Sequence, residues 1–313
     1  MNNEINNKSE MISNQNFDVD YFKEKKINFR IFKDKLFKYA TIAGAIFISL
    51  LLAYILFYIA KQGISSINWS FLTGLPKPPG EIGGGVANAI VGTLIMILLA
   101  SIIAIPVSIA IGVYLSEDRQ TKLSYWVRTG LEILQGMPSI SIGIVVYIWV
   151  VLQMGSFSGF SGGIALAIMM LPVIAKSTEE TLKMVPYSLK EASMALGVPY
   201  YKTILKVVLP SGLSGILTGI LLAVARIAGE TAPLLFTSFG NPFMSTDVMK
   251  PMNSLPLVIF NYASSPYKEW HNLAWGASFL LVLMILILKS CAKVSPDYKL
   301  KSLKLKLIYN VRD

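Results

Sequence analysis

The sequence has 313 residues, of which 54% are hydrophobic and 15% charged, and its mean hydropathy is +0.58. This composition is too apolar for a soluble domain of this length and predicts a protein that crosses a membrane several times. The formal charge of +10 does not indicate nucleic-acid binding, because the basic residues flank apolar stretches and face an anionic lipid surface there. With only Cys291 and His271 of their types, the chain lacks the residues for a disulfide framework or a Cys/His metal cluster.

Six apolar stretches are long enough, or nearly long enough, to cross a membrane as helices. They cover residues 41–60, 86–114, 129–153, 160–175, 211–236 and 273–288. The predicted fold is therefore all-α, a polytopic bundle of about six transmembrane helices. We expect a cytoplasmic polar and basic tail with an interfacial elbow, a transmembrane domain and a basic cytoplasmic tail, at residues 1–38, 39–291 and 292–313 respectively.

Lysine and arginine are concentrated in alternate loops. Segments 1–38, 115–128, 176–210 and 289–313 hold 8, 3, 5 and 7 of the 28 basic residues. Because cytoplasmic loops carry an excess of Lys and Arg, these four segments and both termini are predicted to be cytoplasmic.

Small residues recur inside two of the predicted spans. Gly92, Ser101 and Gly112 in the second span permit close helix packing, and Gly215 and Gly219 in the fifth have the GxxxG spacing of a helix contact. We interpret all five as packing residues.

The third stretch carries a charged pair and then a break in its helical pattern. Arg128 and Glu132 have the spacing of an intrahelical ion pair, and Gly136 and Pro138 follow. The pattern fits a simple proline kink. It fits equally a broken helix whose second half begins at Ser139 and points amide donors into a protein-lined space.

The loop at residues 176–210 has strong local signals. Ser188 and Glu191 have the spacing of a capping box, which predicts a short helix starting at Ser188. Gly197 is suited to end that helix, and Pro199 to begin the next. The loop either docks a partner or packs as a lid on its own bundle, through an apolar face formed by Met184, Leu189, Met194 and Leu196.

The segment "EASMALGVPYYKTILKVVLP" in this loop resembles the EAA loop of ABC-importer permeases. Ser193 replaces the second alanine of that pattern and Val207 its isoleucine, both with residues of similar size. The matching positions are Glu191, Ala192, Gly197, Leu209 and Pro210.

The resemblance implies that this loop is a coupling helix seated on a cytoplasmic ATPase dimer. The sequence contains no G-x-x-x-x-G-K-[ST] phosphate-binding loop, so we expect ATP to be bound by that partner and this chain to have no cofactor and no enzymatic activity. The residues expected to act in coupling are Ser188, Glu191, Ala192, Ser193 and Gly197.

Further segments narrow the resemblance. "GGGVANAIVGTL", "GMPSISIGIVVYIWVV", "ARIAGETAPLLFTSFGN" and "LPLVIFNYASSPYKEWHNLAWG" are similar to permeases of phosphate-specific ABC importers, of the PstA rather than the PstC type. The resemblance extends over residues 83–290. It implies a bacterial inner-membrane permease domain that works with a PstC-type sister permease and an extracytoplasmic phosphate-binding protein.

The motif "ARIAGETAPLLF" places Arg226 and Glu230 four residues apart near the end of an apolar run. Each charge costs about 2.5–3.5 kcal/mol at the centre of a bilayer, so such residues face the bundle interior. A structural ion pair is one alternative. Snorkelling to the outer interface is another, because Arg226 lies about 22 Å along a helix that starts at Ser211. Since the resembled family transports an anion, we expect the substrate pathway to contain Arg226, Glu230, Thr231 and Ser139.

Three functions are alternatives to a phosphate permease. A permease for molybdate or sulfate would share the EAA loop. An ATP-independent transporter would not need that loop. An intramembrane enzyme is disfavoured, because the spans lack paired aspartates, a HEXXH zinc site and a Ser/His pair.

Overall fold

The computed structural model describes residues 2–81, 83–118 and 121–310, and it describes side chains within 33–290. These residues form helices and turns, with one isolated β-bridge between Phe239 and Met252. The chain divides into two units, Met1–Tyr58 and Ile59–Asp313.

The described residues of the first unit lie within helix α1 (Asn2–Gly63). The segment Lys33–Ser66, which adds the 3-10 turn Ile64–Ser66 to the end of α1, is long and apolar enough to span a membrane. The described side chains of residues 33–58 are all exposed. The expected tails at 1–38 and 292–313 fall mostly on side chains outside the described residues, so their roles stay predictions.

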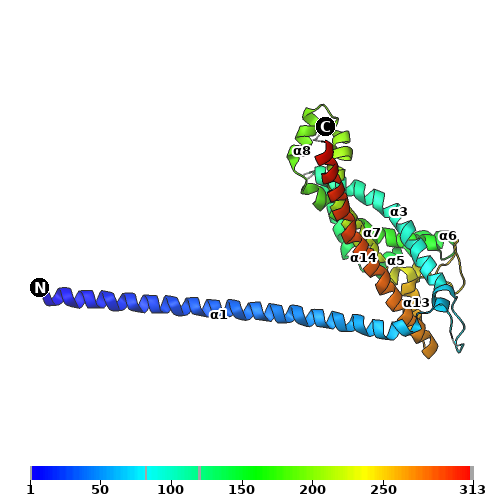
Figure 1. Ribbon diagram of the computed structural model, residues 1–313, viewed down its shortest axis with the longest axis horizontal. Coiled ribbons are helices and arrows are strands. Elements are labelled where there is room, and N and C mark those ends of the chain that lie inside the picture. The colour runs from blue at the N-terminus through cyan, green and yellow to red at the C-terminus, as the bar shows by residue number, and fades with distance from the viewer. Residues whose placement is uncertain (1, 82, 119–120, 311–313) are drawn as a thin grey trace. The chain divides into compact units, whose positions relative to one another are not determined.

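The second unit is a bundle of α-helices. Two of its segments, Tyr147–Val151 and Ile204–Val208, are π-helical. α8 lies at one end of this unit and α13 at the other (Figure 1). Its α-helices are α2 (Trp69–Thr73), α3 (Ala87–Glu117), α4 (Lys122–Gly136), α5 (Ser139–Val146), α6 (Leu152–Met154), α7 (Gly159–Lys183), α8 (Tyr187–Ala195), α9 (Tyr200–Thr203), α10 (Leu209–Ser211), α11 (Leu213–Ile227), α12 (Ala232–Thr237), α13 (Leu255–Ala263) and α14 (Lys268–Asn310).

The helices agree with the predicted number of spans when bent pairs are counted as one. Four single helices qualify as membrane spans, and six spans result if α4 with α5 and α9–α10 with α11 are each counted together. α4 and α5 meet at 105°, and the other pair bends by 68°. The 105° angle far exceeds a simple proline kink, so the third span is a broken helix that restarts at Ser139.

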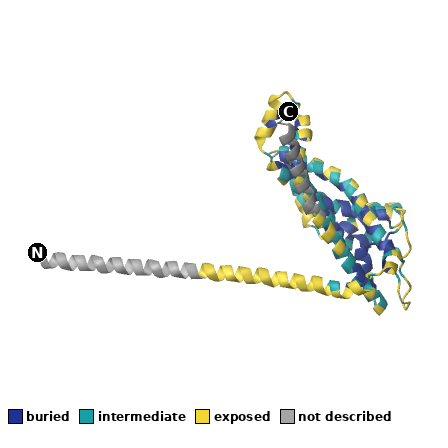
Figure 2. Ribbon diagram, viewed as in Figure 1, coloured by how far each residue is buried: buried dark blue, intermediate teal, exposed yellow. Residues whose placement is uncertain are grey.

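The core lies where α3 packs along α7 (Figures 1 and 2). Ala100 and Ala104 of α3 are fully buried there, together with Leu166 and Met170 of α7. Small residues on α3 let the two backbones approach closely, as the sequence predicted for Gly112.

Gly215 and Gly219 pack against α7 of their own chain. A Cβ added at either position would collide with the side chain of Thr181 or Ser177 respectively. The Ser177 hydroxyl also donates a hydrogen bond of 3.4 Å to the Gly215 carbonyl. The predicted helix contact is therefore confirmed, and α7 is the helix contacted.

Gly112→Ala is expected to destabilise the fold by about 1–3 kcal/mol, because overpacking a tight contact forces the backbone to shift. The new Cβ would lie 2.7 Å from the Ala175 carbonyl oxygen. Thermal unfolding in detergent measures the effect. Gly130→Ala is the matched control, since nothing lies within 4 Å of its added Cβ. Equal melting temperatures for the two variants would contradict the packing described.

Candidate functional site

Arg226 lies at the end of a helix, immediately before a break in the fifth span. α11 ends at Ile227 and α12 begins at Ala232, and Gly229 and Pro233 of this motif suit such a break. The Arg226 carbonyl accepts a hydrogen bond from the Gly229 amide at 3.3 Å, which closes the last turn. A cation in the last turn of a helix is stabilised by the helix dipole, so this position suits arginine.

Arg226 and Glu230 form the predicted pair, but loosely. Arg226 Nε lies 3.9 Å from Glu230 Oε1, and the side chains are 45% and 19% exposed. A long ion pair of this exposure holds its partners weakly. Among the described residues Glu230 is the one ion-pair partner of Arg226, so most donors of the guanidinium fork remain available to an incoming anion.

The break in the third span lies beside the gap between α11 and α12. Ser139 is the first residue of α5 and lies near the carboxyl group of Glu230. α5 packs on α12, where a Cβ on Gly143 would lie 2.7 Å from the Pro233 Cα. The structure thus brings together Ser139, Arg226 and Glu230, which lie up to 91 residues apart in the sequence numbering.

Thr231, the fourth predicted pathway residue, occupies the N-cap position of α12. It is half-buried and makes no side-chain capping hydrogen bond there. Its hydroxyl is therefore not committed to the helix that it begins. The position follows Glu230 directly, so all four predicted pathway residues belong to one region.

The predicted loop helices form, but the details of how they start differ from the prediction. α8 starts at Tyr187 with Pro186 at its N-cap, and no side chain caps it, so the predicted capping box of Ser188 and Glu191 is absent. Proline fixes φ near its helical value and thereby starts the helix one residue earlier. Pro199 is likewise the N-cap of α9 rather than a residue of its first turn. Gly197 has φ of +75°, which confirms the left-handed end predicted there.

The five predicted coupling residues separate into exposed and structural positions. Ser188, Glu191 and Ala192 are exposed on α8, as is Gly197 after it. Ser193 is buried, and its hydroxyl hydrogen-bonds that of Thr203 at 2.9 Å, which ties α8 to α9.

The apolar side chains of this loop are not covered by the bundle. Met184 and Leu196 are 75% and 84% exposed, and Leu189 and Met194 are 42% and 37% exposed. Figure 2 shows the α8 end of the unit as largely exposed. This exposure disfavours the alternative in which the loop is a lid packed on its own helices.

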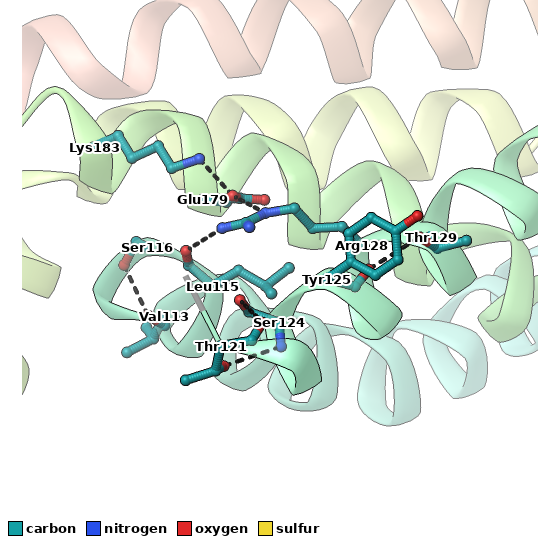
Figure 3. A network of polar contacts seen from close by, with 10 residues as sticks. All are labelled: Val113, Leu115, Ser116, Thr121, Ser124, Tyr125, Arg128, Thr129, Glu179 and Lys183. Carbon is teal, nitrogen blue, oxygen red and sulfur yellow. Dashed lines mark hydrogen bonds and ion pairs between the residues drawn. The ribbon is translucent and has the colours of Figure 1, made fainter. Parts of the chain in front are cut away.

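A charge network around the buried Glu179 was missed by the sequence analysis (Figure 3). Arg128 Nε donates to Glu179 Oε1 at 2.9 Å, and Lys183 Nζ lies 2.5 Å from the same oxygen. Arg128 also donates to the Leu115 carbonyl at 2.8 Å. The predicted pair with Glu132 was wrong, because Arg128 turns toward the buried carboxylate of α7. Only the i, i+4 spacing of Glu179 and Lys183 could have been noticed in the sequence.

The network borders a cleft of about 210 Å³ between α4 and α7. Basic and acidic residues are equal in number around it, so its charge favours neither an anion nor a cation. Its charged lining residues are Arg128, Glu132, Lys176, Glu179, Glu180 and Lys183. Within the described residues no group of three or more His, Cys, Asp or Glu side chains is placed to hold a metal ion.

The chain was compared with known proteins. The family described as "Binding-protein-dependent transport system inner membrane component" matches residues 104–298. Phosphate transport system permease protein PstA of Yersinia pestis is 44% identical over 273 residues, which cover 87% of this chain and 92% of that protein. The probable PstA of Methanocaldococcus jannaschii is 36% identical over 258 residues, covering 82% and 91%.

A solved structure of the inward-facing MetNI methionine ABC transporter has a similar fold. The TM-score is 0.54 at 19% identity, with 72% of this chain and 94% of that chain covered. At this identity the likeness concerns the fold alone. The family match and the close relatives together assign the chain: it belongs to the family of binding-protein-dependent inner-membrane transport components, and within that family to the PstA-type permeases.

Proposed function

We propose that this chain forms one half of the pore of an ATP-driven phosphate importer in the bacterial cytoplasmic membrane. A PstC-type sister permease forms the other half, and an extracytoplasmic binding protein delivers phosphate. A cytoplasmic ATPase dimer binds and hydrolyses ATP, so this chain needs no cofactor of its own. The excess of basic residues in segments 1–38, 176–210 and 289–313 supports an orientation with both termini and α8 on the cytoplasmic side.

One observation supports phosphate as the cargo more than any other. A half-exposed arginine lies at the end of α11, beside the point where the broken third span restarts as α5, in a chain whose relatives are named phosphate transport permeases. Charged residues inside a membrane bundle mark substrate paths, and broken helices there surround protein-lined or water-filled space. A guanidinium fork matches the geometry of phosphate oxygens and stays charged at all physiological pH values.

The geometry of Arg226 and Glu230 suits transient binding. Phosphate approaches the free donors of Arg226 while the Glu230 carboxylate, 3.9 Å from Nε, remains a competing partner. Competition weakens the grip on the anion, and conduction requires a site that the anion can leave. Ser139 and Thr231 offer hydroxyl groups beside this pair.

Movement of the pore depends on the loop that carries α8. Its exposed apolar side chains are suited to a groove on the ATPase, with Ser188, Glu191 and Ala192 in the contact. Ser193 and Gly197 act indirectly, by fixing how α8 joins α9. Closure of the ATPase dimer then moves α8, and the spans reorient around the central path.

Reconstitution with and without the ATPase tests this function. Vesicles that hold the chain, its sister permease and loaded binding protein are expected to take up labelled phosphate only when the ATPase subunit and ATP are both present. Equal uptake in vesicles without the ATPase would contradict the proposal and support an ATP-independent transporter.

A further inference from the structure

The C-terminal half of α3 packs on the coupling loop through Ile109 and Val113, and its last residue adds polar contacts to that loop. Glu117, the last residue of α3, accepts a hydrogen bond from Lys190 Nζ at 2.5 Å through Oε1. Its other oxygen, Oε2, accepts one from the Tyr200 hydroxyl. The carboxylate therefore binds α8 and α9 at the same time.

The ion pair between Lys190 and Glu117 is largely shielded from water, although it lies at the edge of the bundle. The side chains of Lys190 and Glu117 are only 11% and 18% exposed. A nearly buried ammonium group needs a charged partner, and removing that partner costs far more than breaking a surface pair. Glu117 also lies at the negative end of the α3 dipole, which disfavours its charge, so the carboxylate depends on these two donors.

The chain connectivity gives Glu117 a distinct position. α8 is continuous with α7 through residues 184–186, and α9 leads through α10 to α11. α3 has no such covalent link to the loop. Between the described residues, the hydrogen bonds and ion pairs that connect α3 to α8 and α9 are those of Glu117. Since Ser193 and Thr203 tie α8 to α9, both donors move as one body.

We propose that Glu117 is a positioning residue that carries movement of α8 and α9 into α3, an inference that rests on the proposed coupling role of this loop. When the ATPase displaces α8, the two donors pull the Glu117 carboxylate and with it the end of α3. α3 packs along α7, so these two long spans then move together. Without the carboxylate, α3 follows α8 only through its apolar packing on α7 and the loop, so its last turn is held less firmly to α8 and α9.

The test compares phosphate moved per ATP hydrolysed in vesicles that contain the complete complex. Glu117→Ala is expected to lower this ratio about tenfold, because it removes two hydrogen bonds to a charged carboxylate, one of them from a charged donor. Tyr200→Phe removes one neutral donor and keeps the ring, so it is expected to lower the ratio about threefold. Glu180→Gln on α7 is the control and is expected to match the wild type, since Glu180 is exposed.

Charge reversal separates a positioning role from a structural one. The double variant Glu117→Lys with Lys190→Glu is expected to regain part of the ratio that either single variant loses. The inference would be overturned if this double variant regained none of the ratio. A wild-type ratio in Glu117→Ala would also overturn it. If Glu117→Ala does not assemble, an unchanged ratio in Tyr200→Phe would overturn it equally.

A second readout does not depend on the cargo. Spin labels at Ala110 on α3 and Lys202 on α9, both exposed, report the separation of these helices after Cys291 is replaced by serine. Trapping with ATP and vanadate is expected to leave one narrow distance distribution in the wild type and a broadened one in Glu117→Ala. Equal widths would overturn the inference. If the wild-type complex gave the expected distance distributions but moved no phosphate, the proposed cargo would be wrong and the role of Glu117 would stand.

Discussion

Arg226→Ala is expected to reduce phosphate uptake by about 100-fold or more, while the complex still assembles and hydrolyses ATP, because the variant loses a charged bidentate partner for the anion. The loss of fold stability should be small. The pair with Glu230 is long and half-exposed, and such pairs contribute about 0–1 kcal/mol. Uptake of labelled phosphate and the yield of assembled complex are measured on the same preparation.

Two companion variants show how Arg226 acts. Arg226→Lys keeps the charge but not the planar fork, so uptake should be intermediate. Glu230→Gln removes the competing carboxylate, and phosphate should then be released more slowly than in the wild type. Wild-type uptake by Arg226→Ala would contradict the pathway role, whereas loss of assembly in that variant would favour a structural ion pair.

Glu179→Gln is expected to destabilise the protein by about 2–3 kcal/mol, because it leaves Arg128 and Lys183 facing each other without the shared carboxylate. Glu179 is 7% exposed, and Nε of Arg128 and Nζ of Lys183 approach the same oxygen. Since the two cations are 28% and 35% exposed, water screens part of their repulsion, and the loss falls short of that for a fully buried network. Unfolding in detergent, followed by circular dichroism, measures this loss.

The adjacent residue provides the control for Glu179. Glu180 is exposed, so Glu180→Gln makes the same chemical change one position along α7 and is expected to alter stability by less than about 0.5 kcal/mol. If both variants unfolded at the same temperature, the network in Figure 3 would not stabilise the fold as described.

Local features of the chain were predicted well because local physics determines them. The apolar stretches correspond to the spans, since a helix in lipid must satisfy its own backbone hydrogen bonds. Gly197 takes the left-handed conformation that its position after α8 required. The break before α12 follows from the glycine and proline around Glu230.

Contacts between distant segments were not predictable from one sequence. Arg128 pairs with a residue 51 positions away, and Glu117 with residues 73 and 83 positions away. The spacing of residues along the chain does not indicate such long-range partners. For Arg128 it indicated Glu132 instead, four residues away. The 105° bend between α4 and α5 is likewise set by tertiary packing, because Gly136 and Pro138 permit a break without fixing its angle.

The most direct test of the account is ATP-dependent uptake of labelled phosphate, with sulfate and molybdate as competitors, in vesicles that hold this chain with its sister permease, ATPase and binding protein. We predict uptake that requires ATP, that excess sulfate or molybdate does not reduce, and that Arg226→Ala abolishes. A complex that assembles and hydrolyses ATP but moves no phosphate, or moves sulfate or molybdate in its place, would contradict the cargo and with it the role of Arg226.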